Sequence, residues 1–375
     1  MPEKKKGVIV SFGDVVVNRR DQIQDRKSAG IERVVGLDDI VSGDLRIRTW
    51  KGINESPSFK THFKPGQTLF GKRRAYLRKV AYAEFEGICT QNILVLESKN
   101  PNILLPELIP FICNMDSFFN HAIDTSEGSL FPNANWKSMQ EYELFIPLLD
   151  EQKRIAKILQ GMKTTLESIQ WAHKKAFSTR VKLCIDIGNR ADRYRANSLS
   201  TVDSLFDCLD FRRIPLNENQ RKINPGSIPY YGSTGQVDTV GEWIFDESLV
   251  LVAEDGGPFG EFDIKPIAYL VKGKSWVNNH AHVLKPKSDE LITWLFMNLV
   301  HRDLRFYTSG STRGKLNKNQ LLEIPIWMPN TKIIQSLEGA FSDLCRATKK
   351  LEDRIDRLRY KKNLATRETF MERKC

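Results

Sequence analysis

The feature that most constrains this chain is an internal repeat, because the second half of the sequence matches the first at a nearly fixed spacing. The spacing is 182 residues without a gap over residues 128–147, and a looser match at residues 88–92 has a spacing of 188 residues. The identical pairs at the shorter spacing are Gly128-Ser129 with Gly310-Ser311, Asn135 with Asn317, Glu141 with Glu323 and Pro147 with Pro329. A period this long is typical of a duplicated domain, because solenoid repeats are far shorter.

Each half is expected to contain a mixed α/β lobe followed by one long helix. Short apolar runs bounded by Gly, Pro and Asn indicate strands in both lobes. Each lobe ends at a proline, Pro147 or Pro329, after which a long stretch with helical periodicity begins. We therefore predict an α+β fold in pseudo-twofold arrangement. Its segments are a first lobe over 1–149, a long helix over 150–195, a second lobe over 196–329 and a long helix over 330–375.

Both long segments carry apolar or small residues at steps of three and four, which is the heptad spacing of a coiled-coil seam. In the first helix these are Ile155, Ile158, Met162, Ile169, Ala172, Ala176 and Leu183, with Thr165 and Thr179 as weak positions. In the second they are Leu337, Phe341, Leu344, Leu351, Ile355, Leu358 and Ala365, with Thr348 and Lys362 as polar positions.

An apolar seam on a helix has to be buried against another element. Two helices of similar length in one chain favour an antiparallel intramolecular coiled coil, and 35 residues of helix give a spacer of about 50 Å. The alternative is a pair of unrelated surface helices, each packed on its own lobe. We favour the paired helices, because neither helix is surrounded by lobe-like sequence.

The composition of the chain indicates a folded protein with a polyanionic partner. Of its 375 residues 41% are hydrophobic and 27% are charged, and the net charge is +11. Such an excess of Lys and Arg favours nucleic acid, although a basic protein that is merely soluble is the alternative. No apolar run is long enough to cross a bilayer, and the N-terminus does not resemble a signal peptide. We expect a cytoplasmic protein without membrane contact, and the six scattered cysteines indicate neither zinc nor disulfides.

Two sets of residues are candidates for contact with DNA. The first lobe has a dense basic cluster around a tyrosine, comprising Lys72, Arg73, Arg74, Tyr76, Arg78 and Lys79. Arg pairs with guanine O6 and N7, and either cation neutralises phosphate, although such a run is often only a solvated strand face. The second lobe offers polar loop residues, namely Tyr230, Tyr231, Ser233, Thr234, Gln236, Glu254 and Asp255. It also offers cations for phosphates, namely Lys272, Lys274, Arg313, Lys315 and Lys318.

Several catalytic readings fit the sequence less well. Residues 66–73 approach a Walker A loop, but Arg73 replaces the Ser or Thr that holds magnesium. Asp255 with Asp263, Ile264 and Lys265 loosely resembles a metal-dependent nuclease, which we keep as an alternative. The pair His280 and His282 lies on one strand face, yet no third metal ligand is evident in the sequence, so we predict no metal. Neither a glycine-rich cofactor loop nor a methyltransferase catalytic tetrad occurs, so the chain is expected to be non-catalytic.

Several segments of the chain resemble the specificity subunits of Type I restriction–modification enzymes. The junction FIPLLDEQKRIAKIL (145–159) is similar to that family's proline-to-helix junction. Segments similar to its target recognition domains are IPYYGSTGQV (228–237), LVLVAEDGG (249–257), WVNNHAHVLKPK (276–287) and GSTRGKLNKNQLLEIPIWMP (310–329). The second junction, MPNTKIIQSLEG, departs from the pattern because it lacks the acidic run of the first.

The resemblance implies a role as the recognition subunit of a larger complex. Each lobe would be a target recognition domain that reads one half of a bipartite, asymmetric site on double-stranded DNA, with the paired helices setting the spacing. Two methyltransferase subunits would dock on the chain and supply S-adenosylmethionine, and restriction subunits would complete the enzyme. The chain itself would bind no cofactor. A stand-alone nuclease and a non-DNA coiled-coil scaffold remain the alternatives.

Overall fold

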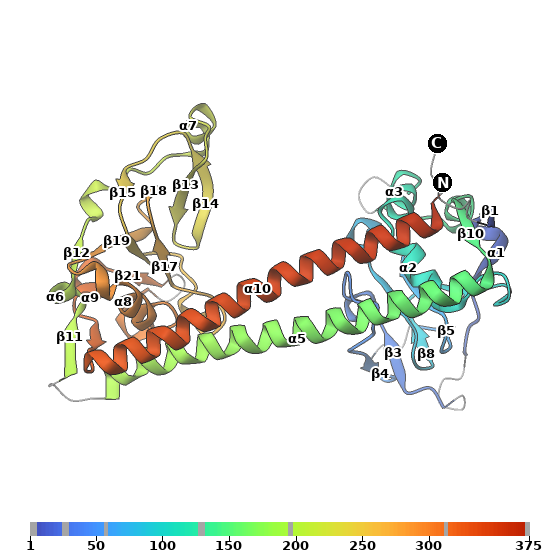
Figure 1. Cartoon of the computed structure of the whole chain (residues 1–375), viewed down its shortest axis with the longest axis horizontal. Coiled ribbons are helices and arrows are strands. Elements are labelled where there is room, and N and C mark those ends of the chain that lie inside the picture. Colours follow the sequence, from blue (N-terminus) through green and yellow to red (C-terminus); the bar gives the residue numbers. More distant parts are fainter. Residues whose placement is uncertain are drawn as a thin grey trace. The chain divides into compact units, whose positions relative to one another are not determined.

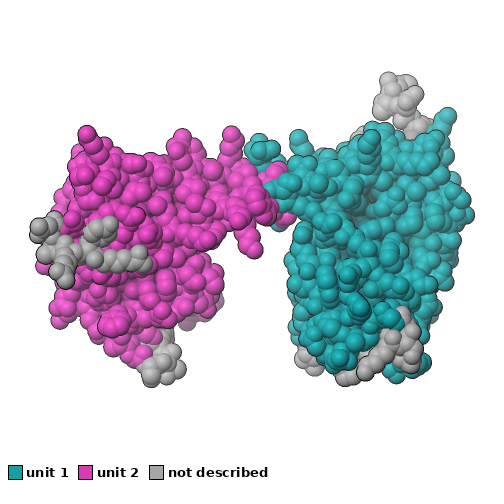
Figure 2. Space-filling model, turned by 90° about the horizontal axis from the view of Figure 1, so that it is seen from below, with its two compact units in different colours: residues 1–168, 354–375 teal, residues 169–353 magenta. Residues whose placement is uncertain are grey.

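A computed structural model describes residues 6–24, 30–55, 59–126, 132–193, 198–310 and 314–371. The chain divides into two compact units, which Figure 2 colours separately. Unit 1 comprises Met1–Ser168 and Arg354–Cys375, and unit 2 comprises Ile169–Asp353. Each unit therefore combines one lobe with a segment of each long helix. None of the helices in the described part of the chain has the length and apolar character that crossing a bilayer requires.

The first lobe is built around two four-stranded sheets within the described residues. The orders are β2-β9-β6-β7, which is antiparallel throughout, and β4-β3-β8-β5, in which β3 and β8 are parallel. A separate ribbon pairs β1 with β10. The strands are β1 (Gly7–Ser11), β2 (Val16–Arg19), β3 (Arg33–Val35), β4 (Lys51–Gly52), β5 (Thr61–Phe63), β6 (Thr68–Gly71), β7 (Val80–Tyr82), β8 (Gly87–Cys89), β9 (Ile93–Ser98) and β10 (Glu143–Pro147). The helices are α1 (Phe12–Val15), η1 (Leu37–Asp39), η2 (Ala75–Leu77), η3 (Pro106–Leu108), α2 (Ile109–Cys113), α3 (Asp116–Asp124) and α4 (Trp136–Met139).

The second lobe repeats this topology and, among the described residues, has a further two-stranded ribbon of β20 and β21. Its sheets have the orders β12-β19-β16-β17 and β14-β13-β18-β15, with β13 and β18 parallel, and β11 pairs with β22. The strands are β11 (Leu199–Thr201), β12 (Phe206–Cys208), β13 (Ile228–Gly232), β14 (Gly235–Val240), β15 (Phe245–Asp246), β16 (Leu249–Ala253), β17 (Ala268–Val271), β18 (Lys274–Val277), β19 (Ala281–Pro286), β20 (Thr308–Ser309), β21 (Lys315–Leu316) and β22 (Pro325–Trp327). The helices are α6 (Val202–Leu205), η5 (Asp210–Arg212), α7 (Glu218–Ile223), η6 (Phe259–Glu261), η7 (Asp289–Leu291), α8 (Ile292–Leu299), η8 (Arg305–Tyr307) and α9 (Lys318–Leu322).

A central strand in one four-stranded sheet of each lobe, β9 or β19, is buried on both faces, and this explains why its sequence is largely apolar. In β9, Leu94 and Leu96 face a core that includes the short helices, whereas Ile93 and Val95 face a second core between the sheets. Successive side chains of a strand point to opposite faces, so a strand covered on both faces is apolar at every position. In β19, Leu284 and Val283 divide between two cores in the same way.

The long helices are α5 (Leu149–Arg193) and α10 (Thr331–Phe370), both drawn as continuous ribbons in Figure 1. In unit 1, Ile155 and Leu159 of α5 share a core with Phe370 of α10. In unit 2, Cys184 and Ile187 of α5 share a core with Ile334 of α10. The start of one helix thus accompanies the end of the other in each unit, so the helices are antiparallel. The predicted fold class, with two mixed α/β lobes and two long helices, is confirmed.

The seam residues of α10 lie where the heptad spacing places them, whereas one residue of α5 does not. Leu337, Phe341, Leu344, Leu351 and Leu358 are half-buried, and Ile355 is buried. In α5, Ile155 and Ile169 are buried and Met162 is half-buried, but Ile158 is 40% exposed. The prediction for Ile158 was wrong by one position, because Leu159 and Leu166 occupy the buried side of the helix there.

The two lobe-to-helix junctions are stabilised differently, in keeping with their different sequences. Gln152, which is 1% exposed, donates to the carbonyls of Ile103 and Pro147 at 2.7 and 2.9 Å and accepts from the Leu105 amide at 3.0 Å. At the second junction the Asn330 side chain accepts from the Ile333 amide at 3.1 Å, as a residue preceding a helix often does. The first junction is therefore tied to its lobe by a side chain that the second one lacks.

Candidate nucleic-acid interface

Two loops occupy equivalent positions in the two lobes, and both contain predicted DNA contacts. Loop A (residues 72–79) joins β6 to β7, and loop B (residues 254–267) joins β16 to β17. At the start of loop A, the Lys72 amide donates to Asn92 O at 2.9 Å and its carbonyl accepts from the Ala134 amide at 2.9 Å. At the start of loop B, the Glu254 amide donates to His280 O at 2.9 Å and its carbonyl accepts from the Leu316 amide at 2.7 Å.

The far ends of the two loops are closed in the same way. The Gly71 amide donates to Lys79 O, and the Ala253 amide donates to Ile267 O, both at 2.9 Å. The spacing between equivalent residues is therefore 182 at Lys72 and Glu254 but 188 at Lys79 and Ile267. Loop B is longer by six residues, whereas the first lobe is longer by six residues between Asn92 and Asn133, and together these two differences account for the spacings seen in the sequence. They also show that the sheets accept loops of different length.

Loop A presents cations and an aromatic ring on a strained turn. Arg73, Arg74 and Tyr76 are exposed, and Lys72 is half-buried. Arg74 and Arg78 have φ angles of 55° and 52°, in the left-handed region that residues with a side chain rarely adopt. Strain of this kind gathers at functional sites, where it is part of how a side chain is aimed.

The two remaining basic residues of loop A have structural roles. Arg78 donates to Asn114 O at 3.1 Å, pairs with Asp116 at 2.6 Å and lies over the Phe119 ring at 4.7 Å. Lys79 donates to Leu37 O at 2.6 Å. These two side chains hold the loop on the lobe, so the cations that loop A presents to solvent are Lys72, Arg73 and Arg74.

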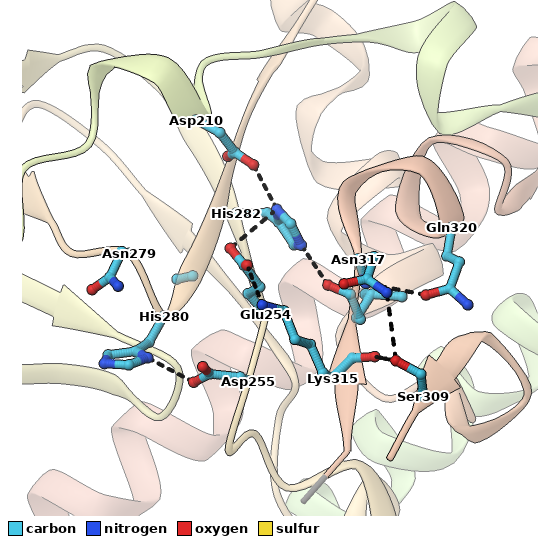
Figure 3. Close-up of polar contacts among 12 residues, drawn as sticks. Asp210, Glu254, Asp255, Asn279, His280, His282, Ser309, Lys315, Asn317 and Gln320 are labelled. Carbon is cyan, nitrogen blue, oxygen red and sulfur yellow. Dashed lines mark hydrogen bonds and ion pairs between the residues drawn. The ribbon is translucent and has the colours of Figure 1, made fainter.

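A buried network of charges lies beneath the start of loop B (Figure 3). His282 is 1% exposed, and its Nδ1 lies 2.6 Å from Asp210 Oδ2 while its Nε2 lies 2.8 Å from Leu316 O. Arg213 lies 2.7 Å from Glu254 Oε2 and 3.5 Å from Asp210 Oδ2. The network therefore ties η5 and β19 to the loop and to β21.

The same network offers one grouping of possible metal ligands, Asp210, Glu254 and His282, within the described residues. The sequence did not reveal it, because the carboxylates are 72 and 28 residues from the histidine. Nε2 of His282 donates to the Leu316 carbonyl, which can only accept, and Nδ1 faces the Asp210 carboxylate. Glu254 is also held by Arg213 and lies 3.5 Å from Lys315. The arrangement is that of an ion-pair network rather than of a metal centre.

The pKa of Asp210 reflects this environment. Burial alone would raise the pKa of this carboxyl, but the hydrogen bond and charge of His282, the Val283 amide and Arg213 together bring it below its ordinary value. Asp210 is therefore ionised near neutral pH. In the first lobe the residues equivalent to Glu254 and His282 are Lys72 and Leu94, so the first lobe lacks this carboxylate and this imidazole.

Asp255 and His280 form a hydrogen-bonded pair at the edge of this network. His280 Nδ1 lies 2.6 Å from Asp255 Oδ1, and the two side chains are 43% and 28% exposed. Asp263 is exposed on loop B, and Lys265 pairs with Glu261 instead. The grouping of metal ligands found among the described residues includes neither Asp255 nor Asp263. The nuclease alternative thus gains no support from the geometry.

The other predicted contacts of the second lobe do not form one surface. Ser233 and Thr234 lie at the tip of the β13–β14 hairpin, beyond the strand ends where loop B also begins. Thr234 lines a cavity of about 540 Å³ together with glycines of loop B and Tyr269. Lys272 and Lys274 lie at the opposite end of β16 and β17, and Lys274 sits 3.5 Å above the Trp243 ring.

Further residues of the predicted set differ in exposure. Gln236, Lys315 and Lys318 are exposed, and Tyr231 is half-buried. Tyr230 is 2% exposed, and its hydroxyl accepts from the Leu216 amide and donates to the Leu216 carbonyl, so it is a core residue rather than a surface contact. Arg313 lies outside the described residues.

Comparisons with known proteins agree with this architecture. A putative type I restriction enzyme specificity subunit from Haemophilus influenzae is 31% identical over 142 residues, covering 37% of this chain and 36% of the relative. The EcoDI specificity subunit of a type I restriction enzyme from Escherichia coli is 26% identical over 114 residues, covering 30% of this chain and 24% of that protein. The chain thus aligns with about a third or less of the length of these curated relatives.

Solved structures show the same fold over almost the whole chain. The S subunit of a Type I restriction–modification system from M. genitalium has a TM-score of 0.60 and 12% identity, covering 99% of this chain and 98% of that one. A chain from a type I R-M system solved in a study of complex assembly has a TM-score of 0.58 and 15% identity, covering 98% and 99%.

The family model for the Type I restriction modification DNA specificity domain matches residues 42–175 and 200–356. The two matches correspond to the two halves of the repeat and together span most of the chain. This chain belongs to the family of Type I restriction modification DNA specificity domains.

Proposed function

We propose that this chain is the DNA-recognition subunit of a Type I restriction–modification complex and reads a bipartite, asymmetric site on double-stranded DNA. The observation that carries the proposal is the pair of equivalent loops with opposite charge. Loop A begins with Lys72, Arg73 and Arg74, whereas loop B begins with Glu254 and Asp255. Donors and acceptors select different base edges in the major groove, so equivalent loops of opposite character favour two different half-sites.

The long helices α5 and α10 repeat in the two halves without this contrast in charge, which supports a role in binding similar partners. We propose that two methyltransferase subunits dock on the chain and carry S-adenosylmethionine, and that restriction subunits join them. The chain itself contributes no chemistry and no cofactor site under this proposal. It would act in the cytoplasm, where its DNA lies.

The decisive test is to reconstitute the full chain with its methyltransferase subunits and to map the methylated positions on DNA. We expect one split motif with unlike halves and an unread spacer. A continuous or palindromic motif would contradict two unlike reading lobes. Incubation of the chain alone with plasmid and magnesium distinguishes the nuclease alternative, because cleavage that is lost in Asp263→Ala would overturn the proposal.

A further inference from the structure

Backbone hydrogen bonds define which residues of the two lobes are structural counterparts next to the reading loops. Because Lys72 and Glu254 donate to Asn92 and His280, Asn92 is the counterpart of His280. The residues that follow, Arg73 and Asp255, are counterparts too. Each makes an isolated antiparallel bridge, to Asn133 and to Lys315, and these partners are 182 residues apart. The pair Asp255 and His280 therefore occupies the place of Arg73 and Asn92.

The backbone around the Asp255–His280 pair is held firmly on both sides. The His280 amide donates to Asn278 Oδ1 at 2.8 Å, and Asp255 is held by its bridge to β21. His282, two residues beyond His280 at the start of β19, lies beside the pair and faces Asp210 and Glu254 (Figure 3). A hydrogen-bonding pair that is fixed before binding loses little conformational freedom when it binds, which favours selective contacts.

The ring of His280 is oriented by its neighbour. Nδ1 donates to the Asp255 carboxylate, and Nε2 has no partner among the described residues. With the side chain 43% exposed, Nε2 is available to a ligand beside the carboxylate. The pair thus presents a nitrogen that donates when the ring is protonated, next to an oxygen that accepts.

We propose that Asp255 and His280 together determine specificity in the second lobe by reading one G·C base pair through the major groove. The proposal rests on the proposed function. Guanine presents the acceptors O6 and N7 there, and cytosine presents the N4 amino donor beside them. In this contact the protonated ring of His280 donates from Nε2 to guanine, and an Asp255 oxygen accepts from cytosine N4. Arg73 and Asn92 in the first lobe offer a different set of groups, so they select a different edge.

The test uses the complex of the full chain with its methyltransferase subunits and compares the methylated motif of wild type with those of two variants. His280→Asn installs the first-lobe counterpart, and Asp255→Asn keeps the shape but removes the charge. We expect each to relax one G·C position of one half-site, with discrimination there falling about tenfold. The other half-site should remain unchanged, which also shows that the variant chain is folded. Asn279→Ala, an exposed neighbour, should retain the wild-type motif.

The possible failures are distinguishable. If the wild-type complex methylates no split motif, both the proposed function and the assignment of Asp255 and His280 are wrong. A split wild-type motif that both variants keep overturns the assignment of the pair alone, as does a relaxed position that carries an A·T pair. If His280→Asn weakens discrimination at both half-sites, the isosteric Asp255→Asn variant decides. Weaker discrimination at one half-site alone supports the assignment of the pair, and an equal loss at both half-sites contradicts it.

Discussion

Asp210 is the carboxylate at the centre of the buried polar network of the second lobe. It accepts from the Val283 amide at 2.8 Å and pairs with His282 and Arg213. Because its folded pKa lies below the ordinary value of 3.8, the carboxylate stabilises the folded state above that pH. This contribution is lost as the pH falls through the folded pKa.

Asp210→Asn should therefore lower the free energy of unfolding by about 3 kcal/mol at neutral pH, because it removes the carboxylate that Arg213 and the buried ring of His282 share. Urea unfolding measures the change, and Asp203→Asn, at an exposed position, is the control. The difference between wild type and Asp210→Asn should shrink once the pH falls below the folded pKa. An equal difference at pH 7 and under strongly acidic conditions would show that the charge is not the cause.

At the residue scale, the sequence predicted which residue types a loop contains better than it predicted which residues those side chains contact. It located the basic run of loop A, but not that Arg78 and Lys79 are engaged by Asp116 and by the Leu37 carbonyl, because those partners lie far away in the chain. It also grouped Tyr230 with Thr234, although Tyr230 is a buried residue of β13 and Thr234 is an exposed residue of the hairpin turn. Partners that only the folded sheets bring together leave no local signal.

At the scale of elements, the paired helices carry a buried cation. Lys362 of α10 is 8% exposed. Burial lowers the pKa of Lys362 below its ordinary value of 10.5, and the charges of Arg359 and Lys163 lower it further, whereas Asp44 acts in the opposite direction. Between the folded pKa and 10.5 the unfolded chain holds the proton more tightly, so the free energy of unfolding rises with pH in that window.

Lys362→Met should raise the free energy of unfolding by about 1 kcal/mol at neutral pH, because a buried charge is replaced by an apolar chain of similar length. The alkaline rise in stability should flatten in the same variant. Denaturant unfolding at several pH values measures both effects, and Lys361→Met, at an exposed neighbouring position, provides the comparison. A less stable Lys362→Met chain would mean that the ammonium group is well compensated by its neighbours.

The two long helices also show where the periodicity of apolar residues is sufficient to identify the buried positions and where it is not. In α10 a step of three or four from Leu337 reaches one large apolar residue, Phe341, and a step from Leu351 reaches Ile355, so the spacing alone identified them. In α5, Ile158 and Leu159 are adjacent and both apolar, and the spacing from Ile155 fits either one. Packing against the lobe decides in favour of Leu159, which is fully buried in the core of unit 1.

At the scale of the whole molecule, the net charge of +11 predicts that the affinity of the chain for double-stranded DNA of random sequence depends on salt. Arg73→Ala and Arg74→Ala should each reduce the slope of log affinity against log salt by about one. Fluorescence anisotropy with a labelled duplex between low and moderate salt measures the slope. Lys274→Ala, at the opposite end of its sheet from the reading loop, should leave it nearly unchanged. Binding that is insensitive to salt would favour a scaffold over a DNA reader.

The duplication, the two lobes and the two long helices were all predictable, since repeats and heptads are patterns within the sequence itself. The equivalence of loop A and loop B was not, because their lengths and charges differ. Only the backbone bonds at Lys72 and Glu254 reveal it. The residues of the two loops thus diverged, whereas the sheets that carry the loops kept the same arrangement.

Unit 1 is not continuous along the chain, and this has a consequence for how the protein is made. Unit 1 takes residues 354–375 from α10, and Phe370 is fully buried in its core. A ribosome therefore delivers the first lobe early but completes its core only after all of unit 2 has emerged. A chain released prematurely within α10 would have an incomplete core in unit 1 and a nearly complete unit 2. The folding of the first lobe therefore depends on residues that are translated long afterwards.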